Sequence, residues 1–136
     1  MSFLSRNSVL KIVEKAINNR EILEVTYKHK DDGEVVIHQI APFDVGSTNT
    51  NPKIRDRNKN NLYAYSFTHL DDKTNRSDPK VCAFNVEQFI LLKPTDQVFN
   101  ENELAQKNLQ AHKFDYRGYT FALLPNRDWF GRKLQK

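Results

Sequence analysis

Four histidines and one cysteine are the side chains of this 136-residue chain best suited to metal binding or acid–base catalysis. They are His29, His38, His69, His112 and Cys82. No two histidines stand in an HxH or HExxH spacing, and Cys82 has no second cysteine for a CxxC pair, so we expect no metal site and no cofactor. His29, His38 and His69 fall on neighbouring expected strands and could meet in space, although half-buried strand histidines without a ligand are the commoner outcome.

The sequence also lacks the other patterns that catalysis requires. The carboxylate pairs Asp31-Asp32 and Asp71-Asp72 each fall where a turn is expected, and aspartate favours turns without any catalytic role. The four glycines are too far apart for a glycine-rich loop that cradles phosphate; they are Gly33, Gly46, Gly118 and Gly131. We therefore expect a binding protein and not an enzyme.

The formal net charge of +4 is modest, but basic residues gather locally. Lys53, Arg55, Arg57 and Lys59 alternate through a segment rich in asparagine, serine and threonine. Such a segment near aromatic strands suits single-stranded nucleic acid, because bases stack on aromatic rings while Lys and Arg follow the phosphates. More commonly, such charges lie on a solvated face and aromatic rings on a strand pack in the core. The stacking candidates are Tyr63, Tyr65, Phe67, Tyr116 and Tyr119, of which Phe67 is expected in the core.

The elements that position these residues begin with a helix. Apolar residues recur at helical spacing from Val9 to Ile17, which makes one apolar stripe that must face a core. Either Asn7 or Ser8 can cap the first turn by accepting a hydrogen bond from an unpaired amide. Asn18-Asn19 ends the pattern, because asparagine tolerates the left-handed conformation that closes helices.

A hairpin follows the helix. From Glu21 to Tyr27 the apolar residues recur at every second position, which predicts a strand with one solvent-exposed face. Asp31-Asp32-Gly33 then supplies a tight turn, so Glu34–Ile40 returns antiparallel to the first strand. Pro42 ends this second strand or sits at its edge, because proline has no amide hydrogen to donate to a ladder.

Further strands complete a small sheet. Asp44–Asn61 reads as a long loop, and loops of that length are usually functional or disordered. Leu62–Phe67 reads as a strand rich in aromatic residues. β-branched and aromatic residues over Lys80–Phe84 and Glu87–Lys93 predict a strand pair or one bent strand, which stops at Lys93-Pro94. Weaker patterns suggest a short helix over Asn102–Ala111 and an edge strand over Phe114–Phe121.

The composition favours a reducing compartment. Cys82 is a single cysteine and cannot form an internal disulfide. The first residues carry no apolar signal region, and the longest apolar run, Phe89–Leu92, is far too short to span a bilayer. We therefore expect a cytoplasmic protein with no membrane partner.

Four stretches of the chain carry a resemblance to a known family. They are Ala16-Ile17-Asn18-Asn19-Arg20-Glu21-Ile22-Leu23-Glu24-Val25-Thr26-Tyr27, then Ile40-Ala41-Pro42, Leu62-Tyr63-Ala64 and Phe84-Asn85-Val86. In order and spacing, from about Val9 to Phe99, they resemble the WYL domain. This family has a small Sm-like, SH3-like β-barrel preceded by a helix and occurs in bacterial and phage-defence regulators.

The resemblance implies a ligand site for oligonucleotides or nucleotides on a polar, basic surface of the barrel. Two residues carry over: Tyr63, at the tyrosine of the family's Trp-Tyr-Leu triplet, and His38, where the family favours arginine. The strand Cys82–Gln88 lacks the three arginines of the family's Arg-x-Phe-Arg-x-x-Arg pattern, and asparagine or glutamine cannot replace a guanidinium fork on phosphate. Our hypothesis is that Lys53, Arg55, Arg57 and Lys59 supply phosphate contacts in their place.

These observations predict an α+β, mostly β fold: an N-terminal helix, a small SH3-like or Sm-like antiparallel β-barrel, and a C-terminal helix and strand extension. Residues 1–99 would form the WYL-like domain, and residues 100–136 would pack on or beside the barrel. We expect a ligand-sensing or regulatory domain that binds single-stranded nucleic acid or a nucleotide-type ligand and modulates a partner process. The alternative is a protein-interaction or dimerisation module without nucleic-acid binding. We expect no DNA-reading helix-turn-helix before the helix.

Overall fold

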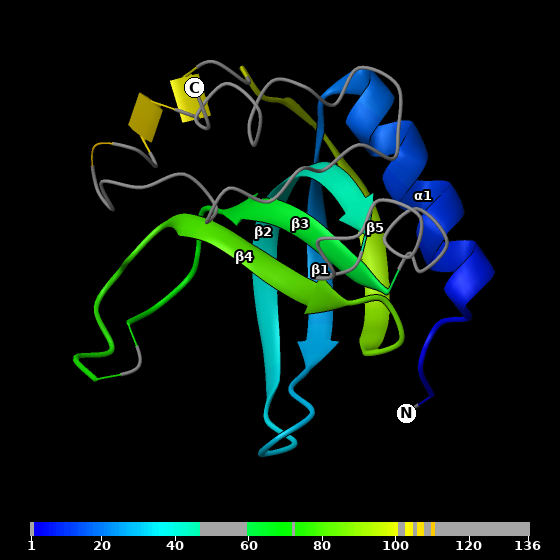
Figure 1. Ribbon diagram of the computed structural model, residues 1–136, viewed down its shortest axis with the longest axis horizontal. Helices are drawn as coiled ribbons and strands as arrows, with labels where there is room; N and C mark the ends of the chain where they lie inside the picture. The colour runs from blue at the N-terminus through cyan, green and yellow to red at the C-terminus, as the bar shows by residue number, and fades with distance from the viewer. Residues whose placement is uncertain are drawn as a thin grey trace.

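The computed structural model of the chain describes residues 2–46, 60–71 and 73–100, together with residues 103, 104, 106, 107 and 110. In the first three of these ranges one helix precedes five strands. They are α1 (Arg6–Asn19), β1 (Glu21–Lys28), β2 (Val35–Gly46), β3 (Asn61–Ser66), β4 (Lys80–Asn85) and β5 (Phe89–Val98) (Figure 1). The described part is therefore mostly β with an N-terminal helix, as the sequence predicts.

Helix α1 confirms the helix predicted from the apolar stripe. Ser5 is its N-cap, and the Ser5 Oγ accepts a hydrogen bond from the amide of Ser8 at 3.2 Å. The helix therefore begins slightly before the expected caps, Asn7 and Ser8. It ends at Arg20, whose backbone is left-handed at φ 57° and whose N–H donates to carbonyls of the last turn. The stripe is buried at Val9, Val13, Ala16 and Ile17.

The predicted hairpin of β1 and β2 is also confirmed. The two strands pair antiparallel, with Tyr27 opposite Val36. In the turn, Gly33 has a φ of 69°, and the Asp32 carboxylate accepts a hydrogen bond from the amide of Glu34 at 2.8 Å. Because neighbouring residues of a strand alternate between faces, this register places Tyr27, Val36 and His38 on the same side of the sheet.

Two prolines lie inside strands. The prediction that Lys93-Pro94 stops a strand is wrong, and of the two alternatives for Pro42, the one in which it ends its strand is also wrong. Strand β2 continues beyond Pro42 to Gly46, with a register shift between Pro42 and Asp44 against β3. Strand β5 continues beyond Pro94, which pairs with Leu23 of β1. Proline is accepted at a bulge or on an edge strand, because its missing amide hydrogen then breaks no ladder bond. Both positions meet one of these conditions.

The five strands form one antiparallel sheet in the order β4-β3-β2-β1-β5. The sheet bends so that β3 and β4 cross β1 and β2 at a steep angle (Figure 1). Among the described residues no ladder joins β4 to β5, so the expected barrel is not closed and the sheet stays open. Side chains occupy this opening: the rings of Phe84 on β4 and Phe89 on β5 pack with centroids 5.9 Å apart.

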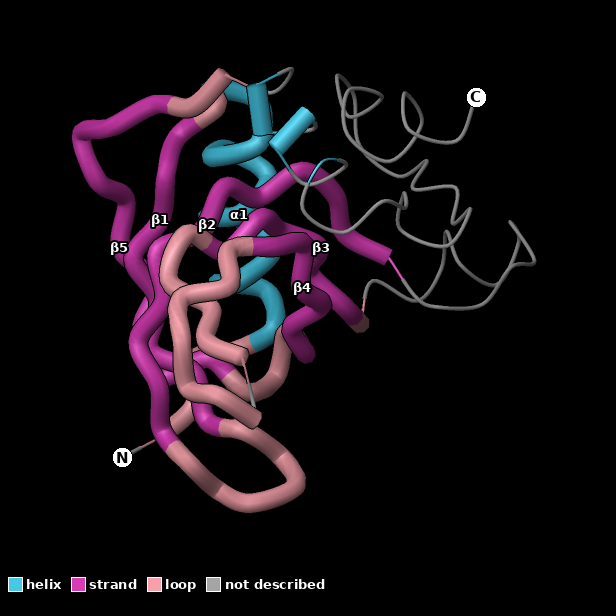
Figure 2. Tube along the Cα trace, turned by 90° about the vertical axis from the view of Figure 1, so that its left-hand side faces the viewer, coloured by secondary structure: helices cyan, strands magenta, loops and turns pink. Residues whose placement is uncertain are grey.

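The two faces of the sheet bury separate cores. Helix α1 contacts β1, β2 and β5 on one face, as Figures 1 and 2 show from two sides. This larger core contains the helix stripe and inward side chains such as Val25, Ile40 and Phe89. The second core contains Phe43, Tyr63 and other residues of β2, β3 and β4, with Phe99 and Leu104.

Several predictions concern residues that lie wholly or partly outside the described ranges. The basic segment 53–59 and the edge strand expected over 114–121 lie outside the described residues. Of the expected helix over 102–111, residues 103, 104, 106, 107 and 110 have helical conformation, and the other positions also lie outside the described residues. No helix in the described part is long and apolar enough to cross a membrane.

Candidate functional site

An open pocket of about 570 Å³ lies where four segments of the chain meet. Its lining comes from four segments: Tyr27 and His29 at the end of β1, Glu34 and Val36–His38 at the start of β2, Thr68–Asp71 and Asn75 in the β3–β4 connection, and Cys82–Phe84 in β4. The volume falls within the range of about 300–1,000 Å³ that is usual for small-molecule sites. The pocket combines aromatic rings, imidazoles and carboxylates.

His38 is the most deeply placed imidazole of the pocket. Its side chain is buried, its Nδ1 lies 3.0 Å from the Ser66 hydroxyl, and its ring packs edge-on against Phe84 with centroids 5.3 Å apart. Burial lowers the pKa of His38 to about 4, and the charges of His69 and His29 act in the same direction. His38 is therefore a neutral hydrogen-bonding group at physiological pH.

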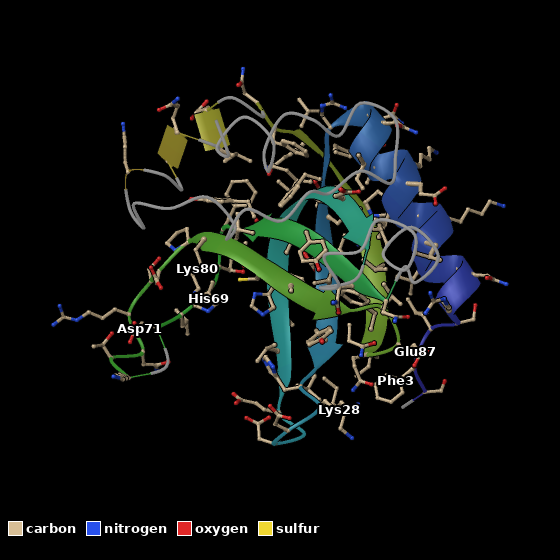
Figure 3. All side chains as sticks on the ribbon, in the orientation of Figure 1. Phe3, Lys28, His69, Asp71, Lys80 and Glu87 are labelled. Carbon is tan, nitrogen blue, oxygen red and sulfur yellow. The ribbon has the colours of Figure 1, made fainter. Side chains whose placement is uncertain are left out.

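The other two histidines lie nearer the mouth of the pocket. His69 is on the connection between β3 and β4 (Figure 3), and its Nδ1 lies 2.9 Å from the Asp78 carbonyl oxygen. Because a carbonyl only accepts, Nδ1 carries a proton, and Nε2 is an acceptor in the neutral ring. The exposed His29 packs edge-on against Tyr27, with ring centroids 5.5 Å apart. The fold thus brings the three histidines to one pocket, although only His38 lies within a strand and the predicted strand positions of His29 and His69 are wrong.

Tyr27 joins the pocket to the core. Its ring packs edge-on against Phe84 and Phe89, with centroids 5.2 and 5.1 Å away. Its hydroxyl oxygen accepts a hydrogen bond from the backbone N–H of Asn85 at 2.8 Å, which links β1 to the end of β4. Burial raises the pKa of Tyr27, so the hydroxyl keeps its proton. The hydroxyl therefore fixes the wall of the pocket formed by β4.

Replacing Tyr27 with phenylalanine should remove only this link. We expect the free energy of unfolding to fall by about 1–2 kcal/mol, because the Asn85 amide loses its acceptor in a half-buried position. Amide hydrogen exchange checks the cause: exchange at Asn85 should accelerate more than exchange at Val86, whose amide donates to the Asn60 carbonyl at 2.9 Å and serves as the internal control. Equal acceleration at both amides would contradict the assignment.

Neither the thiol nor the Asp71 carboxylate of the described pocket has the features of covalent or metal chemistry. Burial raises the pKa of the Cys82 thiol to about 12, so it is not a thiolate nucleophile. Asp71 accepts hydrogen bonds from the amides of Lys73 and Thr74, which lower its pKa and match the turn role predicted for it. Among the described residues no group of three His, Cys, Asp or Glu could hold a metal ion.

The structure separates the residues that the sequence proposed for binding. His38 lines the pocket. Tyr63 is 0% exposed in the second core, where its ring lies 6.5 Å from that of Phe43, so no ring face is available for stacking in this conformation. Tyr65 is buried in the same core, and Phe67 packs against it. The remaining candidates, Lys53, Arg55, Arg57, Lys59, Tyr116 and Tyr119, lie outside the described residues.

Sequence reasoning missed Tyr27, Phe84, Thr68 and Asn75 as lining residues. The hairpin held a usable signal for the first. Once Asp31-Asp32-Gly33 fixes the turn, alternation alone places Tyr27 on the same face as His38. The other three have no such signal, because β4 and the β3–β4 connection reach the pocket only through the bend of the whole sheet.

Comparisons with known proteins add a distant match in structure. No family model and no curated protein matches the sequence. Among solved structures, Proteasome accessory factor B/C (PafBC) of Arthrobacter aurescens aligns with 70% of this chain at a TM-score of 0.46 and 16% sequence identity. The alignment covers 12% of that chain.

Proposed function

We propose that this chain is a regulatory binding domain that takes single-stranded nucleic acid or a nucleotide-type ligand in the pocket between the β1–β2 hairpin and β4. The observation that carries the proposal is the pocket itself, which gathers three histidines and the rings of Tyr27 and Phe84 from separate segments. Imidazole and aromatic rings are the side chains on which unstacked bases are held. We propose no catalytic step.

The WYL resemblance supports the proposal at the level of architecture. An N-terminal helix followed by a bent five-stranded antiparallel sheet is compatible with an Sm-like barrel left open between β4 and β5. We propose that the chain has this WYL-like fold. His38 would then occupy the ligand site that the family lines with arginine, and the nucleotide-type ligand would signal to a partner protein or nucleic acid.

A binding experiment with matched pocket variants tests the proposal. Val36 lines the pocket, whereas its neighbour Val35 is exposed and does not. Fluorescence anisotropy of short labelled single-stranded DNA and RNA should show binding to the full chain at low salt. Val36→Trp should weaken it by about tenfold or more by filling the pocket, and Val35→Trp should leave it unchanged. No binding to the single-stranded DNA or RNA, or equal effects of the two variants on binding, would refute this site for oligonucleotides.

A second candidate function is self-association through the outer face of the sheet. Ile37 and Leu91 are 65% and 44% exposed, and both pair with Thr26, so they lie on one face of the sheet on either side of Thr26. Exposed apolar side chains on one face often mark an interface. A concentration-dependent dimer in analytical ultracentrifugation, together with no oligonucleotide binding, would favour this function over the first.

A further inference from the structure

We infer that the pocket binds the uncharged base of its ligand and leaves the phosphate outside. This inference rests on the proposed function and specifies which part of a nucleotide the pocket recognises. Three features of the lining residues lead to it: their charge, their exposed rings and their hydrogen-bonding groups. Each feature favours a planar heteroaromatic ring over an anion.

The charge of the lining disfavours phosphate. The described lining residues include the carboxylates of Glu34 and Asp71 but no lysine or arginine. Phosphate sites in proteins rely on charge-assisted hydrogen bonds from guanidinium or ammonium groups. Lys80 lies outside the lining, and its charge helps to lower the pKa of Asp71. Because the buried His38 is neutral at physiological pH, an entering phosphate would meet two carboxylates and no lysine or arginine among the described lining residues.

The exposed rings suit a base. His29 is exposed at the mouth and His69 is half-buried, so their imidazoles are the accessible ring surfaces. Behind them, the Tyr27 and His38 rings each pack edge-on against Phe84, so aromatic rings form part of the pocket wall. A base gains stacking and burial in such a site, whereas a phosphate would lose hydration there without a lysine or arginine to pair with.

The hydrogen-bonding groups of the pocket include acceptors as well as donors. His69 uses Nδ1 to bond the Asp78 carbonyl, which leaves Nε2 as an acceptor in the neutral ring. Asn75, with an amide group, and the hydroxyl residue Thr68 also line the pocket, and each side-chain type can both donate and accept. The edges of bases carry donors and acceptors together, whereas phosphate oxygens only accept. The acceptors of this pocket therefore have partners on a base and none on an ionised phosphate.

Titration of the full chain with paired probes tests the inference. The probes are adenosine, guanosine, cytidine and uridine, each beside its 5′-monophosphate, measured by isothermal titration calorimetry at pH 7.5. We expect at least one nucleoside to bind as tightly as its monophosphate or more tightly. Its affinity should change by less than about twofold between about 50 and 200 mM salt, because no phosphate contact is made. Val36→Trp should weaken this binding by about tenfold, and Val35→Trp should not.

The outcomes separate this inference from the proposed function. If monophosphates bind much more tightly than nucleosides, or if inorganic phosphate competes with the monophosphates, the inference is overturned. The proposed function as a nucleotide-binding domain is then retained. Oligonucleotide binding without nucleoside binding would also overturn the inference alone. Failure of nucleosides, monophosphates and single-stranded oligonucleotides to bind would overturn both.

Discussion

Replacing Phe89 with alanine should lower the free energy of unfolding by about 3–5 kcal/mol, which is enough to unfold a large fraction of a marginally stable domain. Phe89 is 0% exposed and belongs to the larger core. Its ring contacts those of Tyr27 and Phe84, and its carbonyl accepts the amide of Leu4 at 2.8 Å. The substitution would leave a cavity under two rings that line the pocket.

Urea unfolding followed by far-ultraviolet circular dichroism measures this effect. Leu91→Ala is the matched control: a register shift in the β1–β5 ladder pairs Phe89 with Tyr27 but Leu91 with Thr26, so Leu91, which is 44% exposed, lies on the opposite face. The control should cost less than about 1 kcal/mol. If the two variants lost similar stability, the ring cluster of Phe89, Tyr27 and Phe84 would not be the support of the open side of the sheet.

Acidification from about pH 6.5 to about pH 4 should weaken the fold through His38. Burial lowers the pKa of this imidazole in the folded state to about 4, below the 6.5 of an ordinary histidine. Between these values the unfolded chain binds a proton that the folded chain does not, so the stability present above pH 6.5 is lost as the pH falls. Because the ring borders an open pocket, we expect a contribution of about 2 kcal/mol, less than the full shift would give.

The contribution of His38 is the difference between two unfolding curves. Urea unfolding of the native chain and of His38→Asn should be compared at several pH values from 7.5 to about 4.5. Asparagine has a polar group that can reach Ser66 and does not titrate. The native chain should lose more stability than the variant on acidification, because only the native chain carries the buried His38 imidazole. Parallel curves would show that His38 is not the proton-linked group.

The local elements were predictable from the residues that form them. The spacing from Val9 to Ile17 makes an amphipathic helix wherever the chain folds, because helical periodicity is a local property. The strand from Glu21 and the turn at Gly33 follow from alternation and from the positive φ that glycine accepts. Aspartate at turns was also predictable, since the Asp32 and Asp71 carboxylates accept hydrogen bonds from amides only two or three residues away.

Tertiary structure decided the features that depend on neighbours distant in sequence. Whether Pro42 and Pro94 interrupt a strand depends on which side of the strand has a partner, and only the sheet order determines this. Tyr63 appeared suited to stacking because alternation cannot tell an aromatic face that meets solvent from one that meets a second core. The pocket likewise requires β4 and the β3–β4 connection to fold over the hairpin. The sequence by itself determined the helix, the strands and the histidines available for a site. The bend of the sheet decided which of those residues share a pocket, because long-range packing and not local periodicity sets that bend.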